Sequence, residues 1–353
     1  MPHLNKVEDL SKLKSEGVTR RKFIQLLSAM TFFGFSDTSK NRRSKNLTGG
    51  GEGMEERAKI SLVKTADRKE GIKKAISLLE LEEEFKGREI LLKPNFNTAD
   101  PFPASTHNDC LEQIVYELRN MGSKKITLGE RSGPPLTEEV MEEKGIFALV
   151  DELGIDLVDF DKLSKEDLPL CRPDESHWDD GFRVAGPVLN AENIVSTCCV
   201  KTHGYGGVFT MSLKLSVGIV PRRGYDYMGE LHSSPDMRKM IAEINQVYSP
   251  SLVVMDAMEV FTDGGPAHGE RKEAGIIFAG KDRVALDASG VALLKNLGAK
   301  EEIMNKDIFE QEQIKRAAQL GLGVDGPEKI DFITPDEKSQ RKAEELKSIL
   351  LDG

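Results

Sequence analysis

The sequence predicts an α/β fold, with mostly parallel sheets flanked by helices. Strand-like and helix-like segments alternate over 58–335, and parallel strands need such crossover helices between them. The segment 193–200 is apolar and rich in β-branched residues, which is typical of a strand buried on both faces. We expect two intimately packed lobes, at about 58–160 and 187–335, with a cleft between them.

The first expected lobe alternates strands and helices over its whole length. Short apolar runs predict strands, and longer amphipathic runs predict helices. The expected elements are, in order, a strand at 58–63, a helix at 69–85, a strand at 89–92, a helix at 109–120, a strand at 125–129, a helix at 138–152 and a strand at 156–160.

An irregular polar stretch, 161–186, leads to the second expected lobe. The same patterns continue there and end in a polar C-terminal helix at 336–353. The expected elements are strands at 193–200, 251–256, 274–279 and 329–333, and helices at 236–247, 283–297 and 308–319.

The N-terminus, 1–35, resembles a twin-arginine export leader. Arg20 and Arg21 precede a modestly apolar run of about 13 residues, shorter than the roughly 20 that span a bilayer. Polar residues and the run Gly49-Gly50-Gly51 make 36–57 a flexible linker. An amphipathic helix is the alternative, and without a small-residue cleavage site an uncleaved, membrane-tethered form stays open. The leader implies export from the cytoplasm through the twin-arginine translocase.

Composition argues against two classes of function. The net charge of −10 lacks the basic excess that attracts nucleic acids. The four cysteines, Cys110, Cys171, Cys198 and Cys199, have no C-x-x-C spacing, so we expect neither a zinc ribbon nor an iron–sulfur cluster ligated by this chain.

Polar residues follow several expected strands where each strand ends. Lys93 and Asn95 follow one strand, Glu130 and Arg131 a second, Lys201 to His203 a third and Asp256 a fourth. Ligands of open parallel sheets bind beyond the carboxyl ends of strands. Each residue alone is ordinary for a solvated lysine or a capping carboxylate, but the recurrence indicates a site.

The segment 201–214 places three glycines between a buried strand and an expected helix. Backbone amides and the positive end of a helix bind anions, although the segment matches neither a P-loop nor a dinucleotide fingerprint. A tight turn that needs positive φ is the alternative. The expected anion- or cofactor-binding residues are Lys93, Asn95, Glu130, Lys201, Thr202, Gly206, Gly207, Thr210, Asp256 and Asp263.

Two histidines are the best placed for chemistry. His203 lies beside the glycine loop and His232 ends a segment rich in glycine and tyrosine. An imidazole there suits a general base or a neutral metal ligand, so both histidines are our metal-ligand candidates. Together with Lys214 they are also our expected catalytic residues. A surface or core histidine is the alternative. Asp282 is expected to cap a helix, and Asp287 is ambiguous.

Several short motifs follow one another along the chain. They are Leu92-Lys93-Pro94-Asn95, Lys201-Thr202-His203, Met211-Ser212-Leu213-Lys214, Gly264-Gly265-Pro266 with Gly269, and Asp282 to Asp287. In this order they resemble the family catalogued as domain of unknown function 362, over about 60–300. Many members also carry ferredoxin-like cysteine clusters, which this chain lacks, so their redox role does not transfer.

A fainter similarity is to the nickel-pincer lactate racemases. His203, Gly206 and Gly207, Lys214 and His232 stand in an order similar to a histidine, glycine loop, lysine and later histidine of that family. This resemblance implies a transition metal or organic cofactor in the cleft between the lobes, with proton shuttling beside it.

These observations favour an exported enzyme that acts on a small anionic substrate. Lys201 and Lys214 would hold negative charge, His203 or His232 would move a proton, and Asp256 would orient one of them. A non-catalytic protein that holds an anion, metal or cofactor for a redox or cofactor-assembly partner is one alternative. A surface scaffold whose polar strand ends are caps and turns is another.

Overall fold

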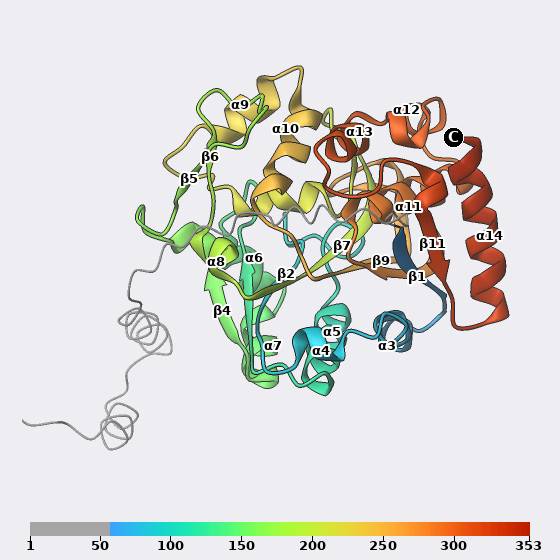
Figure 1. The fold of residues 1–353 in the computed structure, drawn as a ribbon. Coiled ribbons are helices and arrows are strands. Elements are labelled where there is room, and N and C mark those ends of the chain that lie inside the picture. Colours follow the sequence, from blue (N-terminus) through green and yellow to red (C-terminus); the bar gives the residue numbers. More distant parts are fainter. Residues whose placement is uncertain (1–56) are drawn as a thin grey trace, which may run out of the picture. The chain divides into compact units, whose positions relative to one another are not determined.

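The computed structural model describes residues 57–353, which form a central sheet with helices on both faces (Figure 1). Within these residues the sheet has nine strands in the order β11-β1-β10-β9-β7-β2-β3-β4, with β8 paired to β7. The α/β fold class is confirmed. The strands are β1 (Ala58–Lys64), β2 (Glu89–Lys93), β3 (Lys125–Glu130), β4 (Asp156–Asp159), β7 (Asn193–His203), β8 (Val208–Thr210), β9 (Leu252–Gly264), β10 (Gly269–Gly280) and β11 (Ile330–Ile333), and a separate ribbon pairs β5 (Leu170–Cys171) with β6 (Phe182–Arg183).

The sheet is mixed but largely parallel. β10 runs antiparallel to both of its neighbours, β1 and β9, while β9, β7, β2, β3 and β4 pair in parallel. The carboxyl ends of β2, β3, β7 and β9 therefore meet on one side of the sheet, which we call the strand-end edge. In parallel sheets this edge is where ligands bind.

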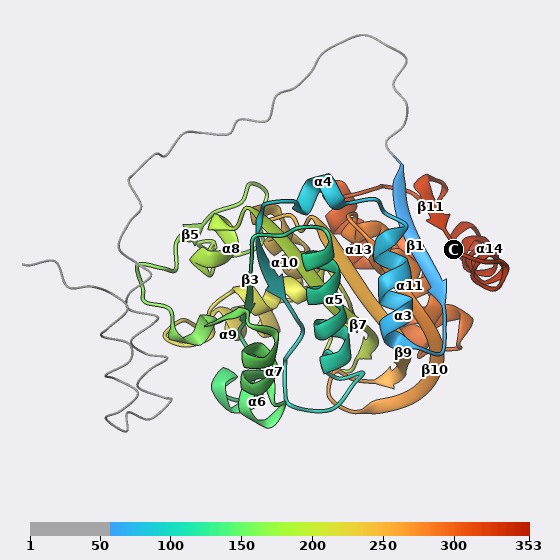
Figure 2. The ribbon, with the colours of Figure 1, turned by 90° about the horizontal axis from the view of Figure 1, so that it is seen from below.

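Helices cover the two faces of the sheet. α3 and α5 lie on one face and α10, α11 and α13 on the other (Figures 1 and 2). The α-helices are α3 (Arg68–Ser77), α4 (Glu82–Phe85), α5 (Asn108–Asn120), α6 (Thr137–Glu143), α7 (Ile146–Leu153), α8 (Gly186–Asn190), α9 (Tyr227–Ser233), α10 (Met237–Ile244), α11 (Arg283–Asn296), α12 (Glu301–Met304), α13 (Glu312–Gln319) and α14 (Glu337–Asp352). Short 3₁₀ helices are η1 (Phe160–Lys162), η2 (Lys214–Ile219), η3 (Asn245–Val247), η4 (Ile308–Glu310) and η5 (Pro327–Lys329).

Two expected helices are each divided in the structure. The helix expected at 69–85 is α3 followed by α4, and the one expected at 138–152 is α6 followed by α7. Gly145, at the second break, has φ 69°, a left-handed conformation that glycine adopts without steric cost. Helix α9 was not expected, because its segment carries several glycine and aromatic residues.

The strands around the glycine loop are longer than expected. The strand expected at 193–200 continues to His203 in β7, and β8 returns beside it, with Lys201 opposite Thr210. The helix expected after the loop is η2, a 3₁₀ helix of six residues. The helix expected after the loop is therefore present, but it is short and of the 3₁₀ type.

The strands of the two expected lobes belong to one sheet. β2 pairs with β7, and β1 pairs with β10 and β11, so strands from 58–160 and 187–335 are interleaved. A separation into lobes stays a prediction. The expected leader, 1–35, and nearly all of the linker, 36–57, lie outside the described residues. Within 57–353, no helix is both long enough and apolar enough to cross a bilayer.

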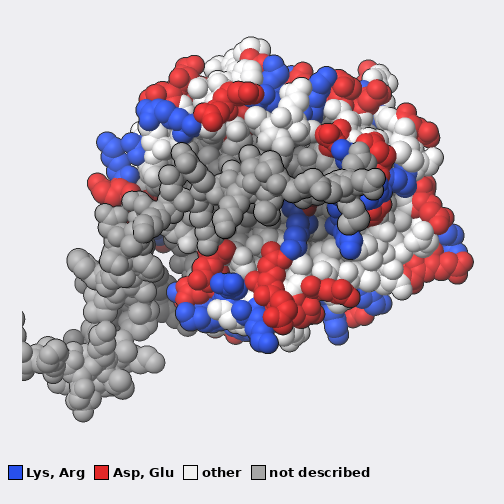
Figure 3. Space-filling view, viewed as in Figure 1, with Lys and Arg blue, Asp and Glu red and all other residues white. Residues whose placement is uncertain are grey.

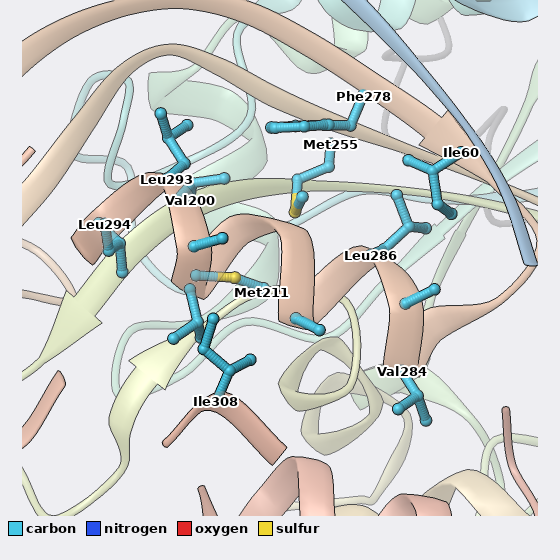
Figure 4. Packing of buried hydrophobic residues seen from close by; sticks show 14 of the residues in the cluster. Ile60, Val200, Met211, Met255, Phe278, Val284, Leu286, Leu293, Leu294 and Ile308 are labelled. Atoms are coloured by element: carbon cyan, nitrogen blue, oxygen red, sulfur yellow. The ribbon is translucent and has the colours of Figure 1, made fainter. Parts of the chain in front are cut away.

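The core beneath the strand-end edge packs around α11 (Figure 4). Phe278 of β10, Met255 of β9 and Val200 of β7 lie with α11 in one buried cluster. Burying a large apolar side chain of this kind contributes about 1.5–3 kcal/mol to stability. Met211 joins the cluster because Gly290 leaves it room: a Cβ on Gly290 would lie 2.3 Å from its sulfur. The core thus anchors the start of the 211–214 turn.

Candidate functional site

A buried ion pair joins the ends of β2 and β3. Nζ of Lys93 contacts Oε1 of Glu130, and both side chains are only 2% exposed. Glu130 also accepts hydrogen bonds from the backbone amides of Phe96 and Arg131, each at 2.8 Å. Burial lowers the pKa of Lys93 and raises that of Glu130, while each charge opposes the shift of the other. The two charges compensate one another, as buried ion pairs must.

Gly218 of η2 packs directly against this ion pair. A Cβ placed on Gly218 would lie 2.8 Å from Nζ of Lys93 and 3.0 Å from Oε1 of Glu130. Only a residue without a side chain fits this position without displacing the pair. Helix η2 therefore closes the strand-end edge over β2 and β3.

Lys201 ends the buried part of β7 without a carboxylate partner. Its side chain is fully buried, and Nζ donates to the carbonyl of Ala104, to which Nδ2 of Asn95 also donates at 3.4 Å. Among residues 57–353 no ion pair forms with Lys201. Burial lowers its pKa, because the charged ammonium loses its hydration.

Two more cations near this edge pair with no carboxylate in the described part of the chain. Arg131 is 5% exposed and donates to the carbonyls of Ser132, at 2.9 Å, and Val217, while its Nε has no partner. Burial lowers the pKa of Arg131 to about 10. Half-buried Lys144 lies 5.1 Å from the ring centre of Phe96, and burial lowers its pKa.

Lys214 starts η2, and its side-chain ammonium forms no hydrogen bond with any described residue. The side chain is half-buried by its exposed area, although its ammonium lies among many protein atoms. Burial, and to a smaller extent the charges of Lys201 and Arg131, lower the pKa of Lys214 to about 8. An amine with this pKa is part neutral near physiological pH, which suits a proton acceptor.

His203 lies next to Lys214 and is uncharged. Burial, together with the charges of Lys214 and Lys201, lowers its pKa to about 2. Nδ1 accepts from the amide of Tyr205 at 3.2 Å, which assigns the ring proton to Nε2. A Cβ on Gly207 would lie 2.9 Å from Nδ1 of His203 and 3.2 Å from Cε of Lys214. Those two atoms therefore lie within about 6 Å of each other.

His232 does not contact His203. It is exposed in α9, and its Nδ1 lies 2.7 Å from the carbonyl of Met228. His232 is the smallest of the influences that lower the pKa of His203, so the two residues lie within electrostatic range. Residues 57–353 contain no group of three or more histidine, cysteine or carboxylate side chains that could hold a metal. The chain's own side chains therefore do not fit a three-ligand metal centre at His203 and His232.

Asp256 has a different partner from the one expected. It forms an ion pair with Arg68, whose Nε lies 2.8 Å from its carboxylate, and accepts from the amide of Met258. It orients neither a site lysine nor a histidine in this structure. Asp263 is exposed and accepts from the amide of Gly264 at 2.7 Å, so it caps the turn between β9 and β10.

The expected threonines and glycines differ in their placement. Thr210 lies opposite Lys201, and its buried hydroxyl has no partner among the described residues. Thr202 lies opposite Phe209, a core residue, so it faces away from Lys201 across the hairpin. The carbonyl of Gly206 accepts from Arg238 at 2.8 Å.

Sequence reasoning missed Lys144 and Gly218 and did not assign Arg131 to the site. Arg131 had a signal, because it directly follows the strand that ends at Glu130. Lys144 lay inside an expected helix, and Gly218 had no neighbouring motif. Their places follow from helix packing, which a single sequence does not display.

The cations that lack a carboxylate partner among the described residues are buried or half-buried rather than exposed on the surface. On the face drawn in Figure 3, acidic and basic side chains lie side by side. A surface hollow of about 350 Å³ lies between α3 and α5, and it contains none of the strand-end residues named above. Lys93, Glu130 and Lys201 are buried at the strand-end edge.

The fold and these motifs define the class of the protein. The family model described as domain of unknown function (DUF362) matches residues 90–292, which include every strand-end residue discussed here except Arg68. The chain belongs to this family.

Individual relatives are distant. A thylakoid-associated protein of Synechocystis sp. is 24% identical over 209 residues, which are 57% of this chain and 61% of that protein. The chain thus matches less than two thirds of the relative's length.

Two solved structures are similar to this chain at low identity. The lactate racemase apoprotein of Thermoanaerobacterium thermosaccharolyticum has a TM-score of 0.42 and 13% identity, covering 82% of this chain and 86% of that chain. A Thermotoga maritima protein has a TM-score of 0.40 and 14% identity, covering 71% of this chain and 59% of that chain.

Proposed function

We propose that the strand-end edge, where the predicted lobes would meet, binds a small anion and that the protein is an enzyme that moves a proton on it. One observation carries the proposal. Arg131, Lys144, Lys201 and Lys214 are buried or half-buried cations, and none pairs with a carboxylate among the described residues.

The buried cations have an energetic cost that a bound anion would offset. A buried charge without a counterion costs several kcal/mol, and a bound anion offsets this cost for every cation it contacts. Uncompensated cations at a strand-end edge are therefore a functional-site signal rather than a source of stability. Since Lys201 is fully buried, an anion would reach its ammonium only when neighbouring segments move.

Proton transfer is the chemistry that the neighbouring groups support. The amine of Lys214, with a pKa of about 8, accepts a proton near neutral pH, and the uncharged ring of His203 lies beside it. Lys201 and Arg131 would hold the anion and stabilise charge that develops on it. His232 would contribute only after movement of α9.

The anion is either a free substrate or the acidic group of an organic cofactor. Both sources share the same recognition chemistry. Inorganic phosphate and a panel of small carboxylates should raise the melting temperature of ligand-free protein in the first case. In the second, mass spectrometry of protein purified under native conditions should find a bound organic acid.

Hydrogen exchange distinguishes an enzyme from a binding protein. A small carboxylate that raises the melting temperature is incubated with the protein in D₂O, and NMR follows its C–H signals. An enzyme that moves a proton on carbon exchanges a C–H for deuterium, and Lys214→Met abolishes this exchange. The exposed-lysine variant Lys315→Met is the matched control and exchanges normally. Binding without any exchange would favour the non-catalytic alternative.

We propose export for the full chain, with residues 1–35 as a twin-arginine leader. Support comes from Arg20 and Arg21 before an apolar run, and a membrane-tethered form is in keeping with the thylakoid association of the Synechocystis relative. A reporter fused to residues 1–57 should leave the cytoplasm, and replacing both arginines with lysine should retain it. Equal export of both fusions would contradict the proposal.

A further inference from the structure

The turn that carries Lys214 is held by a carboxylate from a distant helix. Asp287 of α11 is fully buried and accepts from the amide of Ser212 at 2.8 Å and from that of Leu213 at 3.2 Å. The hydroxyl of Ser212 also donates to the same carboxylate. One side chain therefore fixes the two residues immediately before Lys214.

Asp287 has no ion-pair partner among residues 57–353. Hydrogen bonds from the turn, and a distant one from Gln313 at 3.5 Å, are what satisfy its oxygens. Burial raises the pKa of Asp287 to about 6. An isolated buried carboxylate is costly, and apolar residues would pack the same space more stably. A carboxylate at this position is explained by a role in fixing the geometry of the 211–214 turn.

Asp282, at the start of the same helix, has different hydrogen-bond partners. Asp282 caps the same helix, accepting from the amides of Ala285, at 2.9 Å, and Val324, at 2.8 Å. It contacts no residue of the 211–214 turn. Both aspartates thus stabilise the region, but only Asp287 reaches the segment that presents the lysine.

We propose that Asp287 is the positioning residue of the site: through Ser212 and Leu213 it holds the Lys214 amine in its desolvated place beside His203. This inference rests on the proposed function for its purpose. The hydrogen bond between Ser212 and Asp287 connects two segments of the chain that are 75 residues apart in sequence. The role is positional, since Asp287 contacts the turn and not the amine.

The test measures the pKa of Lys214 itself, in full-length protein without ligand. The rate of acetic anhydride labelling at the Lys214 peptide is followed against pH by mass spectrometry. Asp287→Ala frees the turn, and the pKa of Lys214 should rise from about 8 toward its ordinary 10.5. The neutral amine at pH 8 then falls by up to about 100-fold, with labelling in proportion. Ser212→Ala, which removes one bond, should give a smaller rise.

Asp282→Asn is the matched control. It weakens the cap of the same helix and should lower stability without moving the pKa of Lys214. An unchanged pKa of about 8 in both Asp287→Ala and Ser212→Ala would overturn the proposal and leave Asp287 a structural residue. If Asp287→Ala does not fold, Ser212→Ala decides alone.

The outcome is independent of ligand binding. Failure of every anion to bind, with the Asp287 effect intact, would contradict the proposed function only. Anion binding with a pKa insensitive to Asp287 and Ser212 would contradict only this inference.

Discussion

Lys93 and Lys214 lie at the same edge of the sheet in opposite electrostatic situations. Lys93 contacts Glu130 and is sealed in place by Gly218. Lys214 has no carboxylate partner in the described residues and keeps some exposure to solvent. Glu130 therefore compensates the charge of Lys93, and no described carboxylate compensates that of Lys214.

The difference separates structure from function. A compensated pair stays costly to break and offers nothing to a ligand, whereas an uncompensated cation destabilises the empty protein and attracts an anion. Burial alone does not identify a site, since Lys93 is the more buried of the two lysines. What distinguishes them is whether a carboxylate of the chain pairs with the ammonium.

The largest effect should come from breaking the compensated pair. Lys93→Met leaves the carboxylate of Glu130 buried without a counterion, so the free energy of unfolding at pH 7 should fall by about 3–5 kcal/mol. Urea denaturation measures it. Without Lys93, the raised pKa of Glu130 makes the loss smaller as pH falls, because protonation removes the buried charge. The double variant Lys93→Met/Glu130→Gln should recover most of the loss; a single variant that costs under about 1 kcal/mol would refute the pair's role.

Overpacking the same pair should have the next largest effect. Gly218→Ala puts a methyl group against Lys93 and Glu130, and the free energy of unfolding should fall by about 1–3 kcal/mol. Gly204→Ala is the control, since the nearest atom to its added Cβ is 3.4 Å away. Equal melting temperatures for the two variants would show that η2 does not seal the pair.

The smallest effect, and of opposite sign, should come from Lys214. Lys214→Met removes an uncompensated cation and should stabilise the ligand-free protein at pH 7 by up to about 2 kcal/mol, allowing for its partial exposure. The folded pKa, about 8, is below the ordinary 10.5, so wild-type stability falls as pH drops from 10.5 through 8. The advantage of the variant should therefore grow over that window and then level off. A variant less stable than wild type at pH 7 would mark Lys214 as structural.

The sequence predicts where the strand-end residues lie better than it predicts which side chains pair there. Alternating elements predicted a parallel sheet, so Lys93, Glu130 and Lys201 were expected at one edge, and they are. The pairing of Lys93 with Glu130 depends on the register between β2 and β3, which no local pattern displays. The partner of Asp256 is Arg68, 188 residues away, so Asp256 was assigned to the wrong group.

Local patterns were also misleading where tertiary packing decides. The glycine loop predicted a helix after it, but not that this helix, η2, is a short 3₁₀ helix packed against the ion pair. The ambiguous Asp287 became a specific contact only once α11 was placed against the turn. Chemical roles in this protein come from contacts between distant segments.

Proton uptake on anion binding tests the central claim most directly. An anion bound beside Lys214 favours the charged ammonium and raises its pKa above about 8, so binding at pH 8 should take up about half a proton. Titration calorimetry in buffers of different ionisation enthalpy, with phosphate and small carboxylates, measures this number. We predict uptake by wild type and none by Lys214→Met. Binding by wild type without uptake, or equal binding by the variant, would contradict the account.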